Sequence, residues 1–248
     1  MKRYGLVGYP LEHSLSPQYF NEKFKRFGIS DSRYDLFPLD TIEKFGAFIN
    51  NYSDLQGFNV TIPYKSAIIP YLDKIDPAAE IIGAVNTVKV EHSDSSIILT
   101  GFNTDATAFR NSLKPLLKSC HKRALILGTG GSSKAISFVL NELAIPHIFV
   151  SRNEQQTGSI QYQEITSELI SENYLIINCT PIGMFPDSNA PPIPYKYLSN
   201  KHLLYDLVYN PEKTEFMINA ERMGALAKNG MEMLHLQADA AWEIWNHN

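Results

Sequence analysis

The sequence predicts an α/β protein with two domains, each built on a mainly parallel sheet. In the first half of the chain, short apolar runs typical of strands alternate with helical patterns. A fresh series of strand–helix units begins near Arg123. Strands that alternate with helices favour a parallel sheet covered on both faces. With 248 residues, 44% of them hydrophobic, the chain can form one large core or two smaller ones.

Three strands and two helices are expected at the start of the chain. The strands are predicted at Tyr4–Val7, Tyr34–Phe37 and Gly57–Thr61, and the second helix at Thr41–Tyr52. The first helix is predicted over Ser16–Phe27. Ser16 would be its N-cap, Pro17 would occupy its first position, and Gly28 would follow its end.

A hairpin and a further helix are expected next. Two apolar runs, Val85–Val90 and Ile97–Thr100, flank the polar segment Ser93–Ser96, which is typical of a hairpin. The helix after it would carry Phe109, Leu113, Leu116 and Leu117 on one face. Pro115 is expected to kink that helix.

The second half repeats the strand–helix order. Ala124–Leu127 has the pattern of a buried strand, and a glycine-rich turn and a helix from about Ser133 to Leu143 follow it. Further strands are predicted at His147–Val150, Leu175–Asn178 and Leu203–Val208, and a last helix at His235–Trp245.

The composition excludes several classes of protein. A net charge of −4 without long Lys/Arg runs offers no surface for nucleic acid. No apolar run approaches the ~18 residues of a membrane span, and the N-terminal segment breaks too early for a signal peptide. Cys120 and Cys179 lie far apart, so neither a disulfide framework nor a metal site is expected. A cytoplasmic location is therefore expected.

The glycine-rich turn Gly128-Thr129-Gly130-Gly131-Ser132-Ser133 lies between a predicted strand and a predicted helix, which indicates dinucleotide binding. Gly128 would allow the tight turn, and Gly130 would let the backbone approach a pyrophosphate at the helix N-terminus. Ser133 replaces the usual Gly or Ala and is small enough for close helix packing. An ordinary tight turn without a ligand is the alternative.

The end of the next strand indicates which dinucleotide is bound. NAD sites usually have Asp or Glu there, about 20 residues after the glycines, on the ribose 2′-hydroxyl. This chain has Ser151-Arg152-Asn153 instead, and an arginine can pair with the 2′-phosphate of NADP. NADP(H) is therefore favoured over NAD. The negative charge of Glu154 weakens the positive field around Arg152. A solvated surface arginine without a cofactor role is the alternative for Arg152.

Four polar segments at predicted strand ends carry the candidate chemistry: Tyr9–Pro17, Asn59–Lys65, Gly83–Thr87 and Gly101–Asp105. Their side chains suit a small polyhydroxylated acid. Oxidation of an alcohol sends a hydride to a nicotinamide and leaves a proton for the protein, and Lys65 with Asp105 is the candidate pair for that proton. Taken singly, Lys65 is also compatible with a surface lysine that opens a helix, and Asp105 with a helix N-cap.

These segments resemble those of the shikimate dehydrogenase family. The stretches HSLSP, NVTIPYK, GAVNTV and GFNTD occur in this order, followed by GTGGSS, NCTPIGM and YDLVYNP. The resemblance spans almost the whole chain. It implies the reversible reduction of 3-dehydroshikimate to shikimate with NADPH, in aromatic amino-acid biosynthesis.

The resemblance also implies roles for individual residues. Lys65 and Asp105 would be the catalytic pair. Shikimate or 3-dehydroshikimate would contact Ser14, Ser16, Asn59, Thr61, Asn86, Asp105, Tyr209 and Gln237. The cofactor would contact Gly128, Thr129, Gly130, Gly131, Ser132, Ser151, Arg152, Leu207 and Gly230. No metal is implied.

The family fold implies a discontinuous substrate-binding and catalytic domain of residues 1–105 plus 231–248. Residues 106–230 would form a Rossmann-like NADP-binding domain, with a cleft between the two. A monomer or a homodimer is expected.

The sequence departs from the family pattern in three places. Ser151-Arg152-Asn153 replaces a common Asn-Arg-Thr, and Glu232 replaces a common glycine. Gln155 and Gln156 occupy the region where NADP-specific members often have a second basic residue. With Arg152 as the single basic residue for the 2′-phosphate of NADP, a quinate/shikimate dehydrogenase with relaxed use of NAD and NADP stays open as an alternative. A non-catalytic ligand-binding sensor is the alternative from another class, which the presence of both Lys65 and Asp105 disfavours.

Overall fold

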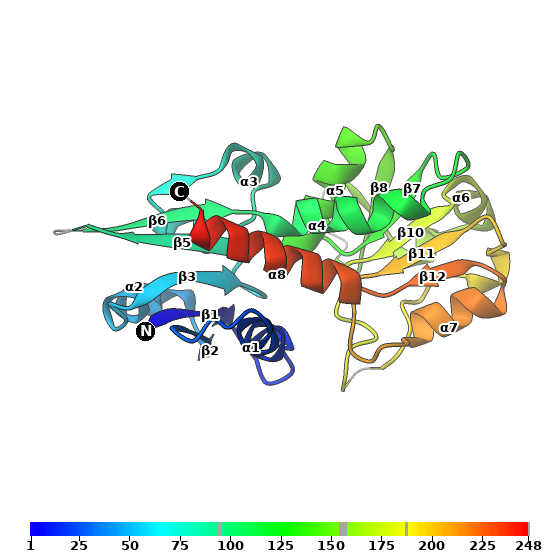
Figure 1. Cartoon of the computed structure of the whole chain (residues 1–248). Helices are drawn as coiled ribbons and strands as arrows, with labels where there is room; N and C mark the ends of the chain where they lie inside the picture. The colour runs from blue at the N-terminus through cyan, green and yellow to red at the C-terminus, as the bar shows by residue number, and fades with distance from the viewer. Residues whose placement is uncertain (94–95, 154–157, 187, 248) are drawn as a thin grey trace. The chain divides into compact units, whose positions relative to one another are not determined.

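The computed structural model describes residues 1–93, 96–153, 158–186 and 188–247 (Figure 1). The chain separates into two compact units. Unit 1 consists of Met1–Asp105 and the C-terminal residues from Gln237 onward, and unit 2 consists of Ala106–Leu236. None of the helices in the described ranges has both the length and the apolar character that crossing a bilayer requires.

Unit 1 contains a six-stranded sheet in the order β2-β1-β3-β5-β6-β4. Its strands are β1 (Lys2–Gly8), β2 (Ser32–Pro38), β3 (Leu55–Val60), β4 (Lys74–Ile75), β5 (Thr87–His92) and β6 (Ile97–Phe102). β5 runs antiparallel to its neighbours β3 and β6, and the other pairs are parallel. Because of this reversal, the C-terminal ends of β1, β3 and β6 lie at the same sheet edge as the beginning of β5.

The helices of unit 1 differ in detail from the sequence predictions. They are α1 (Ser16–Arg26), α2 (Phe45–Asn50), α3 (Pro77–Ile82) and the part of α8 (Met231–Asn246) that follows Leu236, with 3₁₀ turns at Ile42–Lys44 and Ile69–Tyr71. The prediction of Ser16 as N-cap is wrong, because Leu15 holds that position and Ser16 is already helical. Gly28 follows α1 with a φ of +66°, which suits its predicted place after the helix end. The predicted hairpin is confirmed by the antiparallel pairing of β5 and β6.

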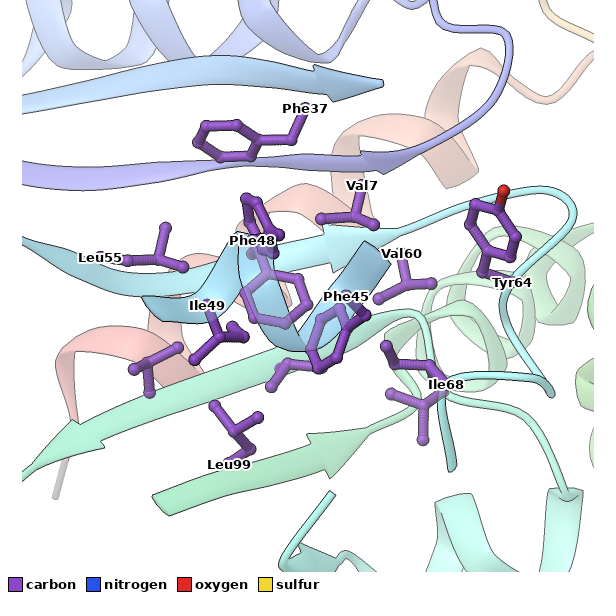
Figure 2. Close-up of a cluster of buried hydrophobic side chains, with 14 of the residues drawn as sticks. Val7, Phe37, Phe45, Phe48, Ile49, Leu55, Val60, Tyr64, Ile68 and Leu99 are labelled. Carbon is purple, nitrogen blue, oxygen red and sulfur yellow. The ribbon is translucent and has the colours of Figure 1, made fainter. Parts of the chain in front are cut away.

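Apolar side chains cover both faces of this sheet. On one face, α2 contributes Phe45, Phe48 and Ile49 to a buried cluster with Phe37 and Val60 (Figure 2). On the other face, α1 and α8 pack around Tyr4 in a second cluster. Trp245 anchors α8 there: its Nε1 donates to Val88 O at 2.9 Å, and a Cβ on Gly57 would lie 2.3 Å from its ring. The last helix is therefore part of the unit 1 core.

Unit 2 contains a parallel six-stranded sheet in the order β12-β11-β10-β7-β8-β9. Its strands are β7 (Ala124–Leu127), β8 (His147–Ser151), β9 (Ser159–Gln161), β10 (Leu175–Asn178), β11 (Leu203–Asp206) and β12 (Leu226–Lys228). Counted from β7, this is the 3-2-1-4-5-6 order of dinucleotide-binding folds, read from the other end. The order reverses between β7 and β10, and ligands of such sheets bind at that point.

The first helix of unit 2 ends where a proline follows it in the sequence. The helices of this unit are α4 (Thr104–Leu113), which starts in unit 1, α5 (Gly131–Glu142), α6 (Ser167–Glu172) and α7 (Glu215–Arg222), with 3₁₀ turns at Lys114–Leu116, Tyr162–Glu164 and Tyr195–Tyr197. The predicted kink at Pro115 is wrong: α4 ends at Leu113, and Pro115 lies in the following 3₁₀ turn. Proline has no N–H to continue the helix, so it ends it.

Candidate active site

Three loops of unit 1 meet at the sheet edge where β3 and β6 end and β5 begins. Lys65 lies after β3, Asn86 directly precedes β5, and Asp105 lies in the first turn of α4. Main-chain hydrogen bonds join these loops: the Val85 amide donates to Lys65 O at 2.7 Å, and the Asn86 amide donates to Phe102 O at 3.1 Å. The pairing of the strands thus brings three of the expected site residues together.

Lys65 and Asp105 form a buried ion pair. Lys65 Nζ lies 2.6 Å from Asp105 Oδ2, and the two side chains are 13% and 7% exposed. The alternative roles do not fit this geometry, because Lys65 is not a surface lysine and α4 already begins at Thr104, before Asp105. A lysine and a carboxylate at this distance can transfer a proton to or from a bound hydroxyl or carbonyl group.

The side-chain amide of Asn86 joins Asp105 to the start of α4. Its Nδ2 donates to Asp105 Oδ1 at 2.9 Å and to Thr104 Oγ1 at 3.0 Å. Its Oδ1 accepts the backbone N–H of Thr104 at 2.7 Å, one of the N–H groups that a helix start leaves without an intrahelical partner. Both carboxylate oxygens of Asp105 therefore accept hydrogen bonds, one from Lys65 and one from Asn86.

Ser14, Ser16 and Thr61 lie at neighbouring strand ends of the same unit. Thr61 directly follows β3, and its backbone amide donates to Val7 O at 2.9 Å. Gly8, at the end of β1, is needed for this approach, because a Cβ there would lie 2.4 Å from Thr61 Cγ2. Ser14 Oγ accepts the backbone N–H of Ser16 at 3.3 Å. The loops after β1 and β3 therefore start side by side.

Asn59 and Gln237, also expected to contact substrate, have different surroundings. Gln237 is partly exposed on α8. Asn59 is only 4% exposed, its Oδ1 accepts the Tyr34 hydroxyl at 2.8 Å, and its Nδ2 donates to Thr87 Oγ1 at 3.1 Å. The sequence does not indicate a site role for Tyr34, and it places Thr87 in the polar segment Gly83–Thr87 without a role of its own. Tyrosine and threonine are ordinary strand residues, and only the pairing of the strands brings them to Asn59.

In unit 2, the glycine-rich turn follows β7 at the point where the strand order reverses. Gly128 has a φ of +107°, a conformation that suits glycine and few other residues. A Cβ there would lie 3.0 Å from Thr180 Cγ2 and 3.4 Å from the Cys179 backbone. Gly128 is therefore required by the fold, whatever the turn binds.

Neither the backbone conformation nor the packing at position 130 requires a glycine there. The φ of Gly130 is −79°, which any residue adopts, and a Cβ there would meet nothing within 4 Å. It is the N-cap of α5, where the backbone amides and the helix dipole favour an anion. Ser133 is fully buried, and its Oγ donates to Gly130 O at 2.6 Å, which fixes the turn that Thr129, Gly131 and Ser132 complete. The turn thus leaves room beside Gly130 at a position suited to a phosphate.

Ser151 and Arg152 lie at the end of β8. Ser151 Oγ accepts the backbone N–H of Asn153 at 3.0 Å, which forms a tight turn around the exposed Arg152. Burial raises the pKa of Tyr162 to about 12, and the Arg152 charge opposes this shift. Gln155 and Gln156, like Glu154, lie outside the described residues.

Leu207 and Gly230 are in contact in unit 2. The Leu207 amide donates to Asn178 O at 2.9 Å, and the Gly230 amide donates to Val208 O at 3.1 Å. A Cβ on Gly230 would lie 2.2 Å from Leu207 O, so glycine is required for this packing. Tyr209, expected to contact substrate, is partly exposed in the same loop. Glu232, which stands where the family has a glycine, is paired with Lys228.

Asp206, at the end of β11, joins the loops around Leu207. It is fully buried, and its Oδ1 accepts from Asn178 Nδ2 at 2.9 Å and from the Val208 amide at 3.0 Å. Its Oδ2 accepts from Thr214 Oγ1 at 2.6 Å. Burial raises the pKa of Asp206 to about 6, although these three hydrogen bonds oppose the shift.

Each unit thus offers a distinct chemistry. Unit 1 has a buried lysine–carboxylate pair beside an amide, which can move a proton. Unit 2 has a glycine turn and a helix N-terminus at the reversal of its strand order, which can hold a dinucleotide. Within the described parts of the chain, no group of three or more His, Cys, Asp or Glu side chains is placed to hold a metal ion.

Comparison with known proteins agrees with both chemistries. Residues 6–88 match the family model of the shikimate dehydrogenase substrate binding domain. The shikimate dehydrogenase (NADP(+)) of Crocosphaera subtropica is 37% identical over 98% of this chain and 90% of its own length. The shikimate dehydrogenase structure from Aquifex aeolicus has a TM-score of 0.88 and 29% identity, and it covers 100% of this chain and 93% of its own.

A structure from Thermus thermophilus, a shikimate 5-dehydrogenase in complex with NADP(H) and shikimate, has a TM-score of 0.86 and 30% identity. It covers 100% of this chain and 94% of its own. The sequence likeness extends over nearly the full length of both proteins. The chain therefore belongs to the shikimate dehydrogenase family.

Proposed function

We propose that this chain is an NADP-dependent shikimate dehydrogenase, which reversibly reduces 3-dehydroshikimate to shikimate in aromatic amino-acid biosynthesis. The buried Lys65–Asp105 pair, with 2.6 Å between Nζ and Oδ2, is the observation that carries the proposal. The activity named for its relatives and the dinucleotide-type strand order of unit 2 support it.

In this proposal, Lys65 transfers the proton. Because both oxygens of Asp105 accept hydrogen bonds, we take Asp105 as the carboxylate and Lys65 as the ammonium that holds the mobile proton. During reduction, Lys65 Nζ gives this proton to the substrate oxygen as the carbonyl becomes a hydroxyl. During oxidation, the same nitrogen accepts it. Asp105 keeps Nζ oriented and balances its charge.

The remaining unit 1 residues are assigned to substrate binding by their chemistry. The hydroxyls of Ser14 and Ser16 suit the carboxylate of shikimate, and Thr61 and Asn86 suit its alcohols. Contacts from Gln237 and Tyr209 remain predictions from the family motifs. The low exposure of the pair limits its contact with water, which strengthens the electrostatic interactions there.

The cofactor is assigned to the glycine turn. NADP(H), when bound, supplies or accepts the hydride. Residues Gly128 to Ser132 suit its pyrophosphate, because space is open beside Gly130 at the N-terminus of α5. Ser151 and the exposed Arg152 suit its 2′-phosphate. Leu207 and Gly230 are proposed to line the same site.

A four-way assay tests the function. Purified protein is supplied with shikimate or quinate, each with NADP or NAD, and formation of reduced nicotinamide is followed by its absorbance. We expect the highest kcat/KM with shikimate and NADP. A preparation that turns over neither acid with either cofactor would contradict the proposal and favour the sensor without catalysis.

A quinate/shikimate dehydrogenase with relaxed cofactor use is the second candidate. It is favoured by the exposure of Arg152 and by the uncharged Gln155 and Gln156 beyond it. In the same assay, comparable kcat/KM values for NADP and NAD, or for shikimate and quinate, support this candidate. A strong preference for both NADP and shikimate rejects it.

Two further predictions concern the protein in the cell and in solution. A cytoplasmic location is expected of a biosynthetic enzyme that uses NADPH, and fractionation of cells would test it. A monomer or a homodimer is expected, and size-exclusion chromatography with light scattering distinguishes them.

A further inference from the structure

A row of buried polar side chains leads from β2 toward the catalytic pair. The Tyr34 hydroxyl donates to Asn59 Oδ1 at 2.8 Å, and Asn59 Nδ2 donates to Thr87 Oγ1 at 3.1 Å. Asn59 and Thr87 are direct partners in the pairing of β3 with β5. Tyr34, Asn59 and Thr87 are 4%, 4% and 0% exposed, so each hydroxyl and amide must find its partner within the protein.

Thr87 connects this row to the Asp105 carboxylate. Its Oγ1 lies 3.3 Å from Asn86 Oδ1 and 3.2 Å from Thr104 Oγ1. Asn86 Nδ2 in turn donates to Thr104 Oγ1 and to Asp105 Oδ1. A single threonine hydroxyl therefore lies between Asn59 and the amide that contacts the catalytic carboxylate.

Groups that only donate or only accept fix the direction of these hydrogen bonds. Asn59 Nδ2 also donates to the Asn86 carbonyl oxygen at 3.2 Å, so its Oδ1 must be the acceptor and Tyr34 the donor. Asn86 Oδ1 accepts the Thr104 backbone N–H, so the Nδ2 end must face Asp105. Thr87 accepts from Asn59, and its own hydrogen points toward Asn86 or Thr104. Neither amide has a second orientation with equal hydrogen bonding.

We propose that Thr87 is a positioning residue for proton transfer, with Tyr34 and Asn59 as its support. Its hydroxyl lies against Asn86 Oδ1 and Thr104 Oγ1 and supports the orientation that the Thr104 N–H gives the Asn86 amide, and that amide holds Asp105 against Lys65. This inference rests on the proposed function of the Lys65–Asp105 pair. It also gives Asn59 a supporting role, because both Nδ2 hydrogens and one lone pair of Oδ1 are used within the protein. The second lone pair of Oδ1 leaves the substrate contact expected from the motif a prediction. Partners behind a reacting group restrict its geometry, and small displacements there reduce rate more than binding.

The test compares Thr87→Val, which keeps the shape and removes the hydroxyl, with Thr87→Ser, which keeps the hydroxyl. For Thr87→Val we expect kcat for shikimate oxidation to fall about tenfold, with KM for shikimate changed by less than about threefold. Thr87→Ser should restore at least about half of the wild-type kcat. Tryptophan fluorescence monitors folding of these variants, because both tryptophans lie in unit 1, where Thr87 is.

Tyr34→Phe removes the first donor and keeps the ring stacked on Phe20, whose centroid is 4.2 Å away. We expect its kcat to fall about two- to fivefold, less than for Thr87→Val, because Tyr34 is two residues further along the row from Asp105. Tyr205→Phe is the matched control, since it removes an equally buried hydroxyl that lies 2.7 Å from Ser112 Oγ in unit 2. Its kcat should equal that of the wild type.

The outcomes separate this inference from the proposed function. If the wild-type protein does not oxidise shikimate, the proposed function fails. If the wild type is active and folded Thr87→Val has the wild-type kcat, the positioning role is overturned. If Thr87→Val does not fold, Tyr34→Phe decides: a wild-type kcat overturns the role, and a reduced kcat at unchanged KM supports it.

Discussion

At the scale of single residues, Lys65 and Asp105 depend on each other. Asp105 is 5% exposed, and an ionised carboxylate so buried needs a positive partner and hydrogen bonds. Lys65 Nζ at 2.6 Å and the Asn86 amide at 2.9 Å meet that need. The proton-transfer residue is therefore also the group that keeps the carboxylate charged, so removing it affects both functions.

Replacement of this lysine tests its assigned role. For Lys65→Ala we expect kcat to fall by about 10²-fold or more with only a modest change in KM, the pattern of an interaction made in the transition state. Steady-state kinetics with shikimate and NADP measure both constants.

Lys44→Ala serves as the control for Lys65→Ala. Lys44 also pairs with an aspartate, Asp40, at 2.7 Å, but its side chain is 60% exposed. An exposed pair of this kind contributes little, so the kcat of Lys44→Ala should match the wild type. Near-normal turnover by Lys65→Ala would leave the proposed proton transfer without its donor.

At the scale of elements, the glycine turn contains two glycines with different reasons to be glycine. The φ of +107° at Gly128 and the contact with Thr180 are properties of the folded chain. Gly130 has an ordinary φ and open space beside it. At the second position glycine is favoured only modestly by the fold, as the N-cap of α5, so substitution there largely separates folding from cofactor binding.

Gly130→Ala should weaken cofactor binding and leave folding almost intact. We expect the free energy of unfolding to change by no more than about 1 kcal/mol, since alanine fits the conformation but is a poorer N-cap. We expect the Kd for NADPH, from fluorescence titration, to rise about tenfold or more, because the added methyl group occupies the space proposed for the pyrophosphate.

Gly128→Ala is the contrasting variant. Alanine at this φ is strained and crowds the Thr180 methyl group, so unfolding should become easier by about 1–3 kcal/mol. Urea denaturation without any cofactor detects this difference. Unchanged NADPH affinity in well-folded Gly130→Ala would remove the main support for the cofactor site.

The existence of most helices and strands could be predicted from the sequence, but some of their ends could not. The apolar run at Ala124–Leu127 and the hairpin of β5 and β6 were predicted because the side-chain period and the turn residues are local signals. The N-cap of α1 was not, because Ser16 suits an N-cap by type and only the backbone shows that Leu15 occupies it. Pro115 was predicted to bend a helix that in fact ends two residues before it.

At the scale of the whole molecule, each unit uses its own sheet topology to gather residues distant in sequence. In unit 1, the reversed direction of β5 brings Asn86 and Thr87 to the edge where β3 and β6 end. In unit 2, the reversal of strand order puts the Gly128 turn next to the loop after β10, which contains Thr180. Motifs could predict Lys65, Asn86 and Asp105. Tyr34 could not be predicted, nor could the partners of Thr104, although Thr104 lies in the GFNTD stretch, because these contacts depend on which strands pair.

Ionisation of the buried Asp206 carboxyl group makes the stability of the protein depend on pH. The pKa of Asp206 is raised from 3.8 to about 6 by burial, so its ionised form is less stable in the folded chain than in the unfolded chain. The stability contributed by this group is therefore fully present below about pH 3.8 and is lost as the pH rises through about 6. The loss at neutral pH amounts to about 3 kcal/mol at most, for a shift of about two pKa units.

Asp206→Asn should remove this pH-dependent loss. Its side-chain oxygen can still accept from Asn178 and Val208, and its amide can donate to the Thr214 hydroxyl, which accepts as readily as it donates. We therefore expect the Tm advantage of the variant over the wild type to be largest at pH 8, smaller near pH 5, and absent only as the pH approaches about 3.8. Calorimetry is the suitable measurement, because both tryptophans lie in unit 1 and do not report on Asp206. A variant that is less stable by the same amount at every pH would mean that the carboxylate stabilises the loops more than its burial costs.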